Sequence, residues 1–413
     1  MSILTSKHLL LGVTGSIAAY KAADLASKLT QEGAQVDVIL TSAAEKFVTP
    51  LTFQSVTGRK AFTEADLWGG EAHVLHVGLG HSADLLVIAP CTANTMAKLA
   101  HGIADNLLTI TALAARCPLL IAPAMDVGMF SHLATQENLK ILVARGAWIA
   151  GPAEGRMASG LSGKGRMVEP AELLGHIRLV LGKNDKLAGR KVVVTAGGTQ
   201  EPLDPVRLLT NRSSGKQGYA LAQAAIDAGA QVTLIAAPTA LSAPVGARLV
   251  EVRTAQEMLE AVLAESASVE ALLMAAAPAD FRPKTVAGDK FKKRDGIPQI
   301  ELEAAPDILE TVSSTSLGAG AGPGSGEKRP RVVVGFAAES RDLLENAAAK
   351  LASKKLDVIA ANDITAPDAG FGADANRVTL IYADGRKEAL PLMSKTEVAE
   401  TIVARLAALL ENK

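Results

Sequence analysis

The residues best suited to chemistry form a small polar cluster in the second half of the chain. Thr210-Asn-Arg-Ser213-Ser214-Gly215-Lys216 combines hydroxyls, a glycine and a lysine just before a segment with helical spacing. At a helix start, such residues can cradle an anion with backbone N–H groups, the helix dipole and an ammonium group. Capping by Ser213 or Ser214 is the simpler alternative, but it does not require Asn, Gly and Lys together. We therefore expect a phosphate site here.

A second glycine-rich turn lies near the start, where Gly12-Val-Thr-Gly15-Ser16 separates an apolar segment from an alanine-rich one. Such a turn favours a phosphate, although a tight turn that needs glycine only for packing explains it equally well. A dinucleotide would require a carboxylate about 20 residues further on. Thr41-Ser42 occupy that place, and Ala236-Ala237-Pro238 occupy its equivalent in the second half. NAD is therefore disfavoured in both halves, and a mononucleotide is favoured.

Polar residues also follow two later apolar segments of the first half. Thr92 and Asn94 lie in Ala89-Pro-Cys-Thr-Ala-Asn-Thr95, and Asp126 follows Ala122-Pro-Ala-Met125. Open α/β sheets bind ligands at the carboxyl ends of their strands, where Thr and Asn can hydrogen-bond a phosphate or the edge of an isoalloxazine ring. Helix capping by Thr92 or Asn94, and a simple turn after Ala122, are the alternatives.

Three histidines, His73, His76 and His81, fall within nine residues. They suggest a metal cluster, but no carboxylate or cysteine in ligand spacing accompanies them. We expect only one of these three histidines to have a functional role.

Charged, amide and aromatic residues, together with the turn Ala305–Ile308, recur along the rest of the second half. They fall at Asp280, Lys290–Lys293, Ala305–Ile308, Phe336, Lys350, Lys354 and Asn362. A charge run such as Lys290–Arg294 is ordinarily a solvated surface, but its spacing within this set argues against that simple interpretation.

Buried strands that alternate with helices must position these residues. The apolar runs 9–13, 36–40, 85–89 and 119–122 have almost no polar interruption, which is typical of strands covered on both faces. Helical spacing marks 17–30, 93–115, 171–181 and 216–228, and further strands are expected at 191–195, 232–236, 271–275, 332–335 and 358–361. The predicted fold class is α/β, with two doubly wound, mostly parallel, Rossmann-like sheets.

The length of 413 residues favours two domains. We place them at 1–182 and 191–413, with 183–190 as a polar linker. Residues 152–170 are interpreted as a long functional flap rather than a regular element, because they are rich in Gly, Ser, Arg and Lys. The glycine-rich insertion 316–329 is expected to be a disordered surface loop.

The composition limits which classes of ligand and which cellular compartment are expected. The formal net charge of -1 argues against a nucleic-acid binder, and no apolar stretch is long enough to span a membrane. Cys91 and Cys117 are the only cysteines, which fits a reduced compartment, and the first residues lack an export signal. We expect a cytoplasmic protein that binds small molecules.

The first-half motifs together resemble the flavin-containing cysteine decarboxylases. The resemblance is carried by Gly15–Lys21, His76, Ala89–Thr95, Pro123–Asp126 and the flap sequence Gly163–Arg166. It implies that FMN is bound by Gly15, Ser16, Thr41, Thr92, Asn94 and Thr95. It also implies a catalytic His76, a contact from Met125 to the substrate carboxylate, and a flap with Arg166 that closes over the substrate. In that family, FMN oxidises the thiol-bearing carbon, and the resulting thioaldehyde makes loss of carbon dioxide easy.

Two catalytic positions depart from that family. Asp126 stands where Asn is usual, and Ser159 stands where Cys is usual. An ionised Asp126 would repel a carboxylate, so it must be protonated, redirected or assisted by a cation. Serine is a far weaker acid than cysteine, so another group or water protonates the product, or the reaction stops at the enethiol. We favour full turnover.

The second half resembles phosphopantothenate-cysteine ligase, and the order of the halves resembles the bacterial bifunctional enzymes of coenzyme A synthesis. The resemblance implies that CTP is bound by Ser213, Ser214, Gly215, Lys216, Asp280, Lys290, Ala305, Pro306, Asp307, Ile308, Phe336, Lys350 and Lys354. Asn211 would contact the acyl intermediate, Lys290 would serve the transfer chemistry, and Mg²⁺ would bridge the CTP phosphates. Ala305 replaces a usual Asn and Pro278 a usual aliphatic residue, which would loosen cytosine recognition.

The implied substrates are 4′-phosphopantothenate, cysteine and CTP, and the implied assembly is a homo-oligomer, a dodecamer. Two alternatives stay open. One is a nicotinamide-dependent reductase, which the missing strand-end acids weaken. The other is an active ligase whose flavin half is impaired, or stops at the enethiol, because of Asp126 and Ser159.

Overall fold

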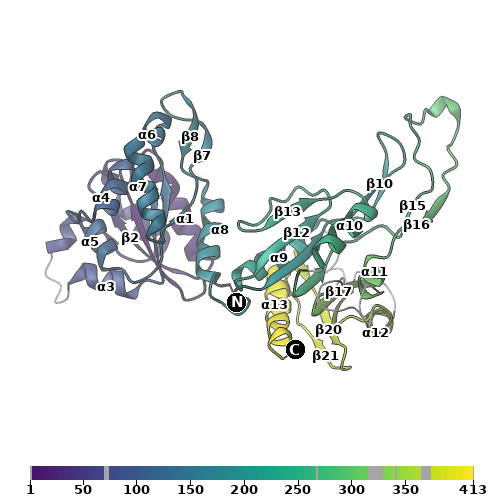
Figure 1. The fold of residues 1–413 in the computed structure, drawn as a ribbon. Coiled ribbons are helices and arrows are strands. Elements are labelled where there is room, and N and C mark those ends of the chain that lie inside the picture. Colours follow the sequence, from purple (N-terminus) through teal and green to yellow (C-terminus); the bar gives the residue numbers. More distant parts are fainter. Residues whose placement is uncertain are drawn as a thin grey trace, which may run out of the picture. The chain divides into compact units, whose positions relative to one another are not determined.

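The computed structural model describes residues 2–68, 74–266, 268–314, 329–339, 342–363 and 374–412. The chain divides into two compact units, Met1–Gly182 and Lys183–Lys413. Each unit is built around its own sheet (Figure 1). No helix among these described residues is long and apolar enough to cross a membrane.

The first unit contains a six-stranded parallel sheet with the strand order β3-β2-β1-β4-β5-β6. Its strands are β1 (His8–Val13), β2 (Gln35–Leu40), β3 (Ala61–Phe62), β4 (Leu85–Cys91), β5 (Leu119–Pro123) and β6 (Trp148–Ile149). This is the Rossmann order, with the reversal between β1 and β4. Its helices are α1 (Ala19–Gln31), α2 (Pro50–Thr57), α3 (Leu75–Ser82), α4 (Ala93–His101), α5 (Leu107–Ala114), α6 (Val127–Ser131), α7 (Leu133–Ala144) and α8 (Pro170–Gly182).

Alternate residues of each central strand enter different cores, because successive side chains point to opposite faces of a sheet. Leu9 and Leu11 pack with α1, α2 and α8, whereas Leu10 packs with α3, α4, α5 and α7. Cys91, at the end of β4, is fully buried in this second core, and Cys117 is half-buried. Both faces of the sheet are therefore covered.

The second unit contains an eight-stranded sheet with the order β13-β12-β9-β14-β17-β18-β20-β21. Its strands are β9 (Lys191–Ala196), β12 (Gln231–Ala236), β13 (Arg248–Glu251), β14 (Ala271–Met274), β17 (Val332–Glu339), β18 (Val358–Asp363), β20 (Val378–Tyr382) and β21 (Lys387–Ala389). The first six repeat the parallel Rossmann order, and β20 and β21 add an antiparallel edge. The predicted fold class is confirmed.

Helices also cover both faces of the second sheet. They are α9 (Lys216–Asp227), α10 (Ala255–Ser266), α11 (Ile308–Ser314), α12 (Leu343–Ser353) and α13 (Lys395–Asn412). One core joins α10, α11 and α12 to the sheet, and α9 and α13 pack on each other and on the sheet. Three small antiparallel pairs complete the unit: β10 (Gln200–Pro202) with β11 (Leu208–Thr210), β15 (Phe281–Pro283) with β16 (Leu302–Ala304), and β19 (Ala375–Asn376) with β22 (Met393–Ser394). The segment from β15 to β16 forms a long arm that extends away from the sheet (Figure 1).

Two sequence predictions about local structure were wrong. The single helix expected over 93–115 is two helices, because Gly102 ends α4 in the left-handed region and Asn106 starts α5 with a capping box to Thr109. The segment expected to lack regular structure contains the hairpin β7 (Ala153–Arg156) and β8 (Ser162–Arg166). Its strands are polar and glycine-rich, so they show no alternation of apolar residues.

The expected linker 183–190 packs on the second unit. Leu187 is buried and its N–H donates to the carbonyl of Ala228 at 2.7 Å. The Arg190 guanidinium pairs with Glu270 at 2.8 Å. The insertion predicted at 316–329 lies outside the described residues, except for Arg329.

Candidate functional site

The turn between β1 and α1 lies against the turn that follows β2. A Cβ at Gly15 would lie only 2.4 Å from the Cβ of Ala43, so this approach requires glycine. The Thr41 hydroxyl accepts a hydrogen bond from the Ala44 N–H at 3.3 Å. Helix α1 begins without a side-chain cap and without an acidic residue in its first turn. Its start is therefore suited to an anion.

Thr14 holds the carboxyl ends of β1 and β4 together. Its hydroxyl donates to the Pro90 carbonyl at 2.7 Å and accepts from the Thr92 N–H at 3.1 Å. The Thr92 hydroxyl accepts from the Thr95 N–H at 3.3 Å, so Thr92 caps α4 as the simpler alternative predicted. Asn94 is exposed and Thr95 is buried at the same helix start.

A cavity of about 500 Å³ lies between the β1–α1 turn, the β5–α6 turn and the β7–β8 hairpin. Among the predicted residues, its lining includes Ser16, Met125, Asp126, Ser159 and Arg166. The others predicted for this unit are Gly15, Thr41, Thr92, Asn94, Thr95 and His76, and they do not line it. His76 is half-buried in α3, His81 is exposed, and His73 lies outside the described residues. The lining also includes Ile17 and Tyr20, each 62% exposed.

Asp126 and Ser159, the two departures noted in the sequence, are hydrogen-bonded to each other. The Ser159 hydroxyl donates to Asp126 Oδ2 at 2.6 Å, and the Gly128 N–H donates to Oδ1 at 3.0 Å. These two donors, Ser159 first, hold the pKa of Asp126 below its ordinary value. Asp126 is therefore ionised at neutral pH, and both of its oxygens are occupied at the start of α6.

Sequence reasoning gave no role to Lys21, which also lines this cavity. Its side chain is buried, and Nζ donates to Glu169 Oε1 at 2.7 Å and to the Met167 carbonyl at 3.3 Å. Arg166 pairs with the same Glu169 oxygen at 3.2 Å. Lys21 thus joins α1 to the end of the hairpin, and a lysine buried within an otherwise apolar helix face is the signal that could have identified it.

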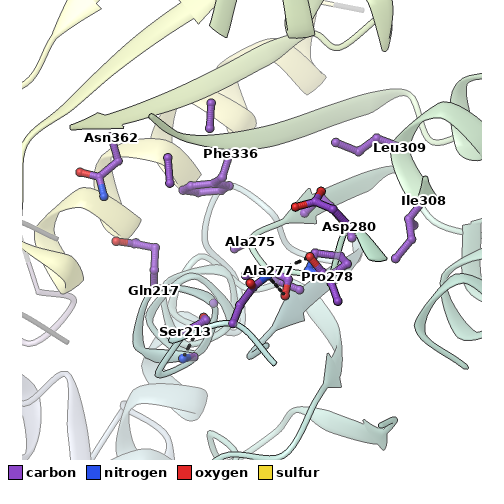
Figure 2. Close-up of a pocket in the computed structure, with 18 of the residues that line it drawn as sticks. Ser213, Gln217, Ala275, Ala277, Pro278, Asp280, Ile308, Leu309, Phe336 and Asn362 are labelled. Carbon is purple, nitrogen blue, oxygen red and sulfur yellow. Dashed lines mark hydrogen bonds between the residues drawn. The ribbon is translucent and has the colours of Figure 1, made fainter. Parts of the chain in front are cut away.

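A larger cavity, of about 670 Å³, lies at the carboxyl ends of β14, β17 and β18 in the second unit (Figure 2). The predicted residues that line it are Asn211, Ser213, Ser214, Gly215, Lys216, Asp280, Ala305, Pro306, Asp307, Ile308, Phe336 and Lys350. Lys290 and Lys354 do not line it. This edge is where open α/β sheets bind ligands.

Three polar side chains hold the loop 275–280 along the floor of this cavity. The hydroxyls of Thr195 and Thr199 accept from the N–H groups of Ala276 and Ala279 at 3.1 and 2.9 Å. Asn211 Nδ2 donates to the carbonyls of Ala277 and Pro278 at 3.1 and 3.0 Å. Asn211 therefore fixes the backbone beside the site.

Gly215 precedes α9 with φ +76°, and no side chain caps this helix. A Cβ at Gly215 would lie 2.8 Å from Thr239 Cγ2, so the close approach also requires glycine. The capping role considered for Ser213 and Ser214 is thus absent at α9. The helix start faces the cavity with Lys216 as its first residue.

The two predicted lysines of α12 have different partners. Lys350 Nζ donates to the Phe336 carbonyl at 3.1 Å at the cavity. Lys354 Nζ pairs with Glu310 at 2.7 Å and Asp307 at 2.9 Å, and these carboxylates raise its pKa. Burial favours protonation of Asp307, but the Glu310 N–H and Lys354 outweigh it, so the pKa of Asp307 is lowered. Lys354 thus positions the turn that starts α11.

Lys290 is exposed on the arm between β15 and β16. The arm is held to the β10–β11 turn by Asp204, which is buried and accepts from the N–H groups of Val206, Arg207 and Phe291 at 2.7, 2.7 and 3.1 Å. The Arg207 guanidinium adds an ion pair at 2.5 Å. Burial alone would raise the pKa of Asp204, but these donors lower it to about 2.

Four polar side chains that line the cavity were given no role by the sequence predictions: Gln217, Asn362, Asn376 and Lys395. Asn362 is the last residue but one of β18 and was noted without a role. Lys395 follows Ser394, whose hydroxyl and N–H exchange hydrogen bonds with Glu397, a capping box that marks a helix start. That pattern could have drawn attention to Lys395.

Two family models cover almost the whole chain. The model described as "Flavoprotein" matches residues 2–181, and that described as "DNA/pantothenate metabolism flavoprotein C-terminal domain" matches residues 187–410. Two solved structures each correspond to one part. The C-terminal domain of a coenzyme A biosynthesis bifunctional protein CoaBC is 38% identical, with a TM-score of 0.46, over 56% of this chain and 100% of that one. A PPC decarboxylase mutant complexed with pantothenoylaminoethenethiol is 34% identical, with a TM-score of 0.39, over 42% of this chain and 97% of that one.

Curated relatives match across both units. The coenzyme A biosynthesis bifunctional protein CoaBC of Bacillus subtilis is 44% identical over 410 residues, which cover 98% of each chain. The protein of the same name from Mycobacterium tuberculosis is 44% identical over 408 residues, 96% of this chain and 95% of the relative. The chain therefore belongs to the family of coenzyme A biosynthesis bifunctional proteins.

Proposed function

We propose that the chain catalyses two consecutive steps of coenzyme A biosynthesis. The second unit joins 4′-phosphopantothenate to cysteine at the expense of CTP, and the first unit decarboxylates the product with FMN to give 4′-phosphopantetheine. Family membership across 98% of the chain supports a ligase and a decarboxylase together. The observation that carries the proposal is the second-unit cavity, which gathers an uncapped helix start, hydroxyls and lysines at one sheet edge.

The ligase step requires a nucleotide and a carboxylate in one cavity. The substrate carboxylate attacks the α-phosphorus of CTP, which forms an acyl cytidylate and releases pyrophosphate; the amine of cysteine then displaces CMP. Lys216 and Lys350 line the cavity as cations that can neutralise phosphate charge as it develops. Mg²⁺ would be held mainly by the CTP phosphates.

The first-unit residues fit a flavin mononucleotide. The uncapped start of α1 suits its phosphate, and the exposed apolar side chains of Ile17 and Tyr20 suit an aromatic ring system. When bound, FMN supplies a two-electron acceptor for the thiol-bearing carbon of the substrate. The residues proposed to hold it are still those of the three strand-end turns: Gly15, Ser16, Thr41, Thr92, Asn94 and Thr95.

The chain's own groups handle the substrate carboxylate in the smaller cavity. Arg156 and Arg166 line it and can offset the negative charge of Asp126. Asp126 is a poor proton donor, because its low pKa keeps it ionised. The Ser159 hydroxyl is committed to Asp126, so we assign protonation of the product to another group or to water, and we assign Ser159 to the closure of the hairpin.

We also propose that the protein works in the cytoplasm as a homo-oligomer, with a dodecamer as the assembly expected from the resemblance. The arm carries several exposed apolar side chains, namely Phe281, Val286, Ile297, Ile300 and Leu302. Such a surface on a projecting segment supports association. Sedimentation velocity would measure the assembly directly.

The function is tested by incubating the purified protein with CTP, 4′-phosphopantothenate and cysteine. We expect pyrophosphate, CMP and carbon dioxide, and a thiol product with the mass of 4′-phosphopantetheine. An enethiol product would mean that reduction is missing, and accumulation of 4′-phosphopantothenoylcysteine would mean that only the ligase works. The relatives are named bifunctional proteins, and this name gives no support to an enethiol product or to a ligase that works alone.

Binding of NADH or NADPH without a yellow flavin would favour a reductase and contradict the proposal. Protein that is colourless and also releases no pyrophosphate would exclude both proposed activities.

A further inference from the structure

Thr14 connects two of the first-unit turns that are proposed to hold the flavin. It directly follows β1, and its carbonyl accepts from the Ser16 N–H at 2.8 Å. Its hydroxyl accepts from the N–H of Thr92, the residue that caps α4, at 3.1 Å. One residue therefore has direct hydrogen bonds to the β1–α1 turn and to the β4–α4 turn.

The side chain of Thr14 takes over where the pairing of β1 with β4 stops. The two strands pair as far as Gly12 with Ile88. The same register places Thr14 opposite Pro90, and proline has no N–H with which to continue a ladder. The Thr14 hydroxyl donates to the Pro90 carbonyl at 2.7 Å. A side chain thus makes the connection that the backbone of β4 cannot make there.

Both hydrogen bonds of the Thr14 hydroxyl are made away from water, because Thr14 is only 1% exposed. A buried donor or acceptor that loses its partner is costly to the structure that contains it. Valine has nearly the shape of threonine but no hydroxyl, so it would take this acceptor from the Thr92 N–H and this donor from the Pro90 carbonyl. The spacing of the two turns therefore depends on the Thr14 hydroxyl.

The hydrogen bonds continue from Thr92 to another residue predicted for the flavin. The Thr92 hydroxyl accepts from the Thr95 N–H at 3.3 Å and donates to the Thr95 hydroxyl at 3.2 Å. Ser16, Thr92 and Thr95 are thus linked through Thr14. The link lies between β1 and β4, where the strand order of the sheet reverses. Open α/β sheets bind their ligands at this reversal.

The second unit has a similar contact at its own reversal. Thr195, in β9, is fully buried, and its hydroxyl accepts from the Ala276 N–H at 3.1 Å, just beyond β14. β9 and β14 are the neighbours between which the order of that sheet reverses. A buried threonine hydroxyl therefore spans the reversal in both units, which argues that the contact of Thr14 serves the ligand edge and not only local packing.

We propose that Thr14 is a positioning residue for FMN. It sets the spacing between the turn that carries Ser16 and the turn that carries Thr92 and Thr95. Thr14 does not line the neighbouring cavity, so it acts on the ligand through these two turns. The inference rests on the proposed flavin function of the first unit, and it adds a residue that holds the predicted FMN residues in place.

The test measures the affinity of full-length protein for FMN. Protein freed of flavin is titrated with FMN, and binding is followed by the quenching of flavin fluorescence. We expect Thr14→Val to raise the Kd about tenfold or more, because two buried hydrogen-bonding groups lose this partner. Thr14→Ser keeps the hydroxyl and should restore most of the affinity.

Thr111→Val is the matched control. Thr111 is fully buried in the same unit, and its hydroxyl donates to the Leu107 carbonyl at 2.7 Å within α5. The substitution removes a buried hydrogen bond of the same kind without touching either turn, so the Kd for FMN should stay within about twofold of wild type. Far-UV circular dichroism checks that each variant is folded.

An unchanged Kd in Thr14→Val would overturn the proposal. So would an equal loss of affinity in Thr14→Ser or in Thr111→Val, because a general loss of stability would then explain it. Amide hydrogen exchange of residues 91–95 tests the link without flavin: Thr14→Val should speed exchange there, and Thr111→Val should not. If wild type bound no FMN, the flavin function would fail, and with it the role of Thr14 toward FMN; faster exchange in Thr14→Val would show that the link between the turns exists all the same.

Discussion

Asp126 and Ser159 function as a pair. Asp126 caps α6 with one oxygen and holds the tip of the hairpin through the other. The negative charge of Asp126, which would repel a substrate carboxylate, is thereby directed toward the Gly128 N–H and the Ser159 hydroxyl. Arg156 and Arg166 line the same cavity. Of the possibilities considered from the sequence, redirection with assistance from cations is the one that the geometry supports.

Breaking this pair should loosen the hairpin. Ser159→Ala removes the donor, and we expect amide hydrogen exchange in residues 157–162 to become about fivefold faster, which loss of one hydrogen bond to a charged group can produce. Asp126→Ala removes the acceptor of the same hydrogen bond, so it should have a similar effect.

The double variant should exchange no faster than either single variant, because both remove the same contact. Ser162→Ala, on β8 beside the hairpin tip, serves as the control. Additive effects, or unchanged exchange in Ser159→Ala, would show that the hydrogen bond does not restrain the hairpin.

At the scale of elements, the buried carboxylate of Asp204 helps to hold the arm from β15 to β16 against the β10–β11 turn. Asp204 accepts hydrogen bonds from both the β10–β11 turn and the arm. The pKa of Asp204 is about 2 in the folded protein, below the ordinary 3.8, so the folded state prefers the ionised form. Its contribution to stability is complete above about pH 4 and is lost as the pH falls toward 2.

Asp204→Asn should therefore lower the unfolding midpoint of the second unit at pH 7, because an amide cannot accept from all of these donors. The difference from wild type should shrink as the pH falls from about 4 to about 2, where wild-type Asp204 also becomes protonated. Thermal unfolding followed by circular dichroism from pH 7 to pH 2.5 measures this. A difference that stayed constant with pH would show that the charge of Asp204 is not what holds the arm.

The strands and the ligand edges could be predicted from the sequence, because a strand buried on both faces is an unbroken apolar run and its carboxyl end is where polar residues gather. For example, the strand predicted at 85–89 is Leu85–Cys91 in the structure, longer only at its carboxyl end. The β7–β8 hairpin could not be predicted in this way, because its pairing is made by the backbone of polar, glycine-rich residues. Asn376 and Lys395 were missed because their link to Gln217 joins residues more than 150 positions apart.

At the scale of the whole molecule, each of the two units has its own core and its own candidate site. The core residues of each sheet come from its own unit, so each cavity is supported by its own helices. Both candidate sites lie at the carboxyl edge of a Rossmann-type sheet, and each includes a helix start without a side-chain cap. The same combination of a Rossmann-type sheet edge and an uncapped helix start therefore occurs at both candidate sites.

The burial of Cys91 within β4 has a consequence for a protein that handles thiols. Its pKa is raised to about 12 by burial, and burial also raises the pKa of Cys117, so neither sulfur is a thiolate at physiological pH. With serine at position 159, the smaller cavity has no cysteine in its lining. We expect N-ethylmaleimide at pH 7 to leave both activities intact and to modify neither cysteine quickly by intact-mass analysis; rapid inactivation would contradict this. An enzyme without reactive sulfur cannot be trapped in a mixed disulfide with the very metabolite it releases.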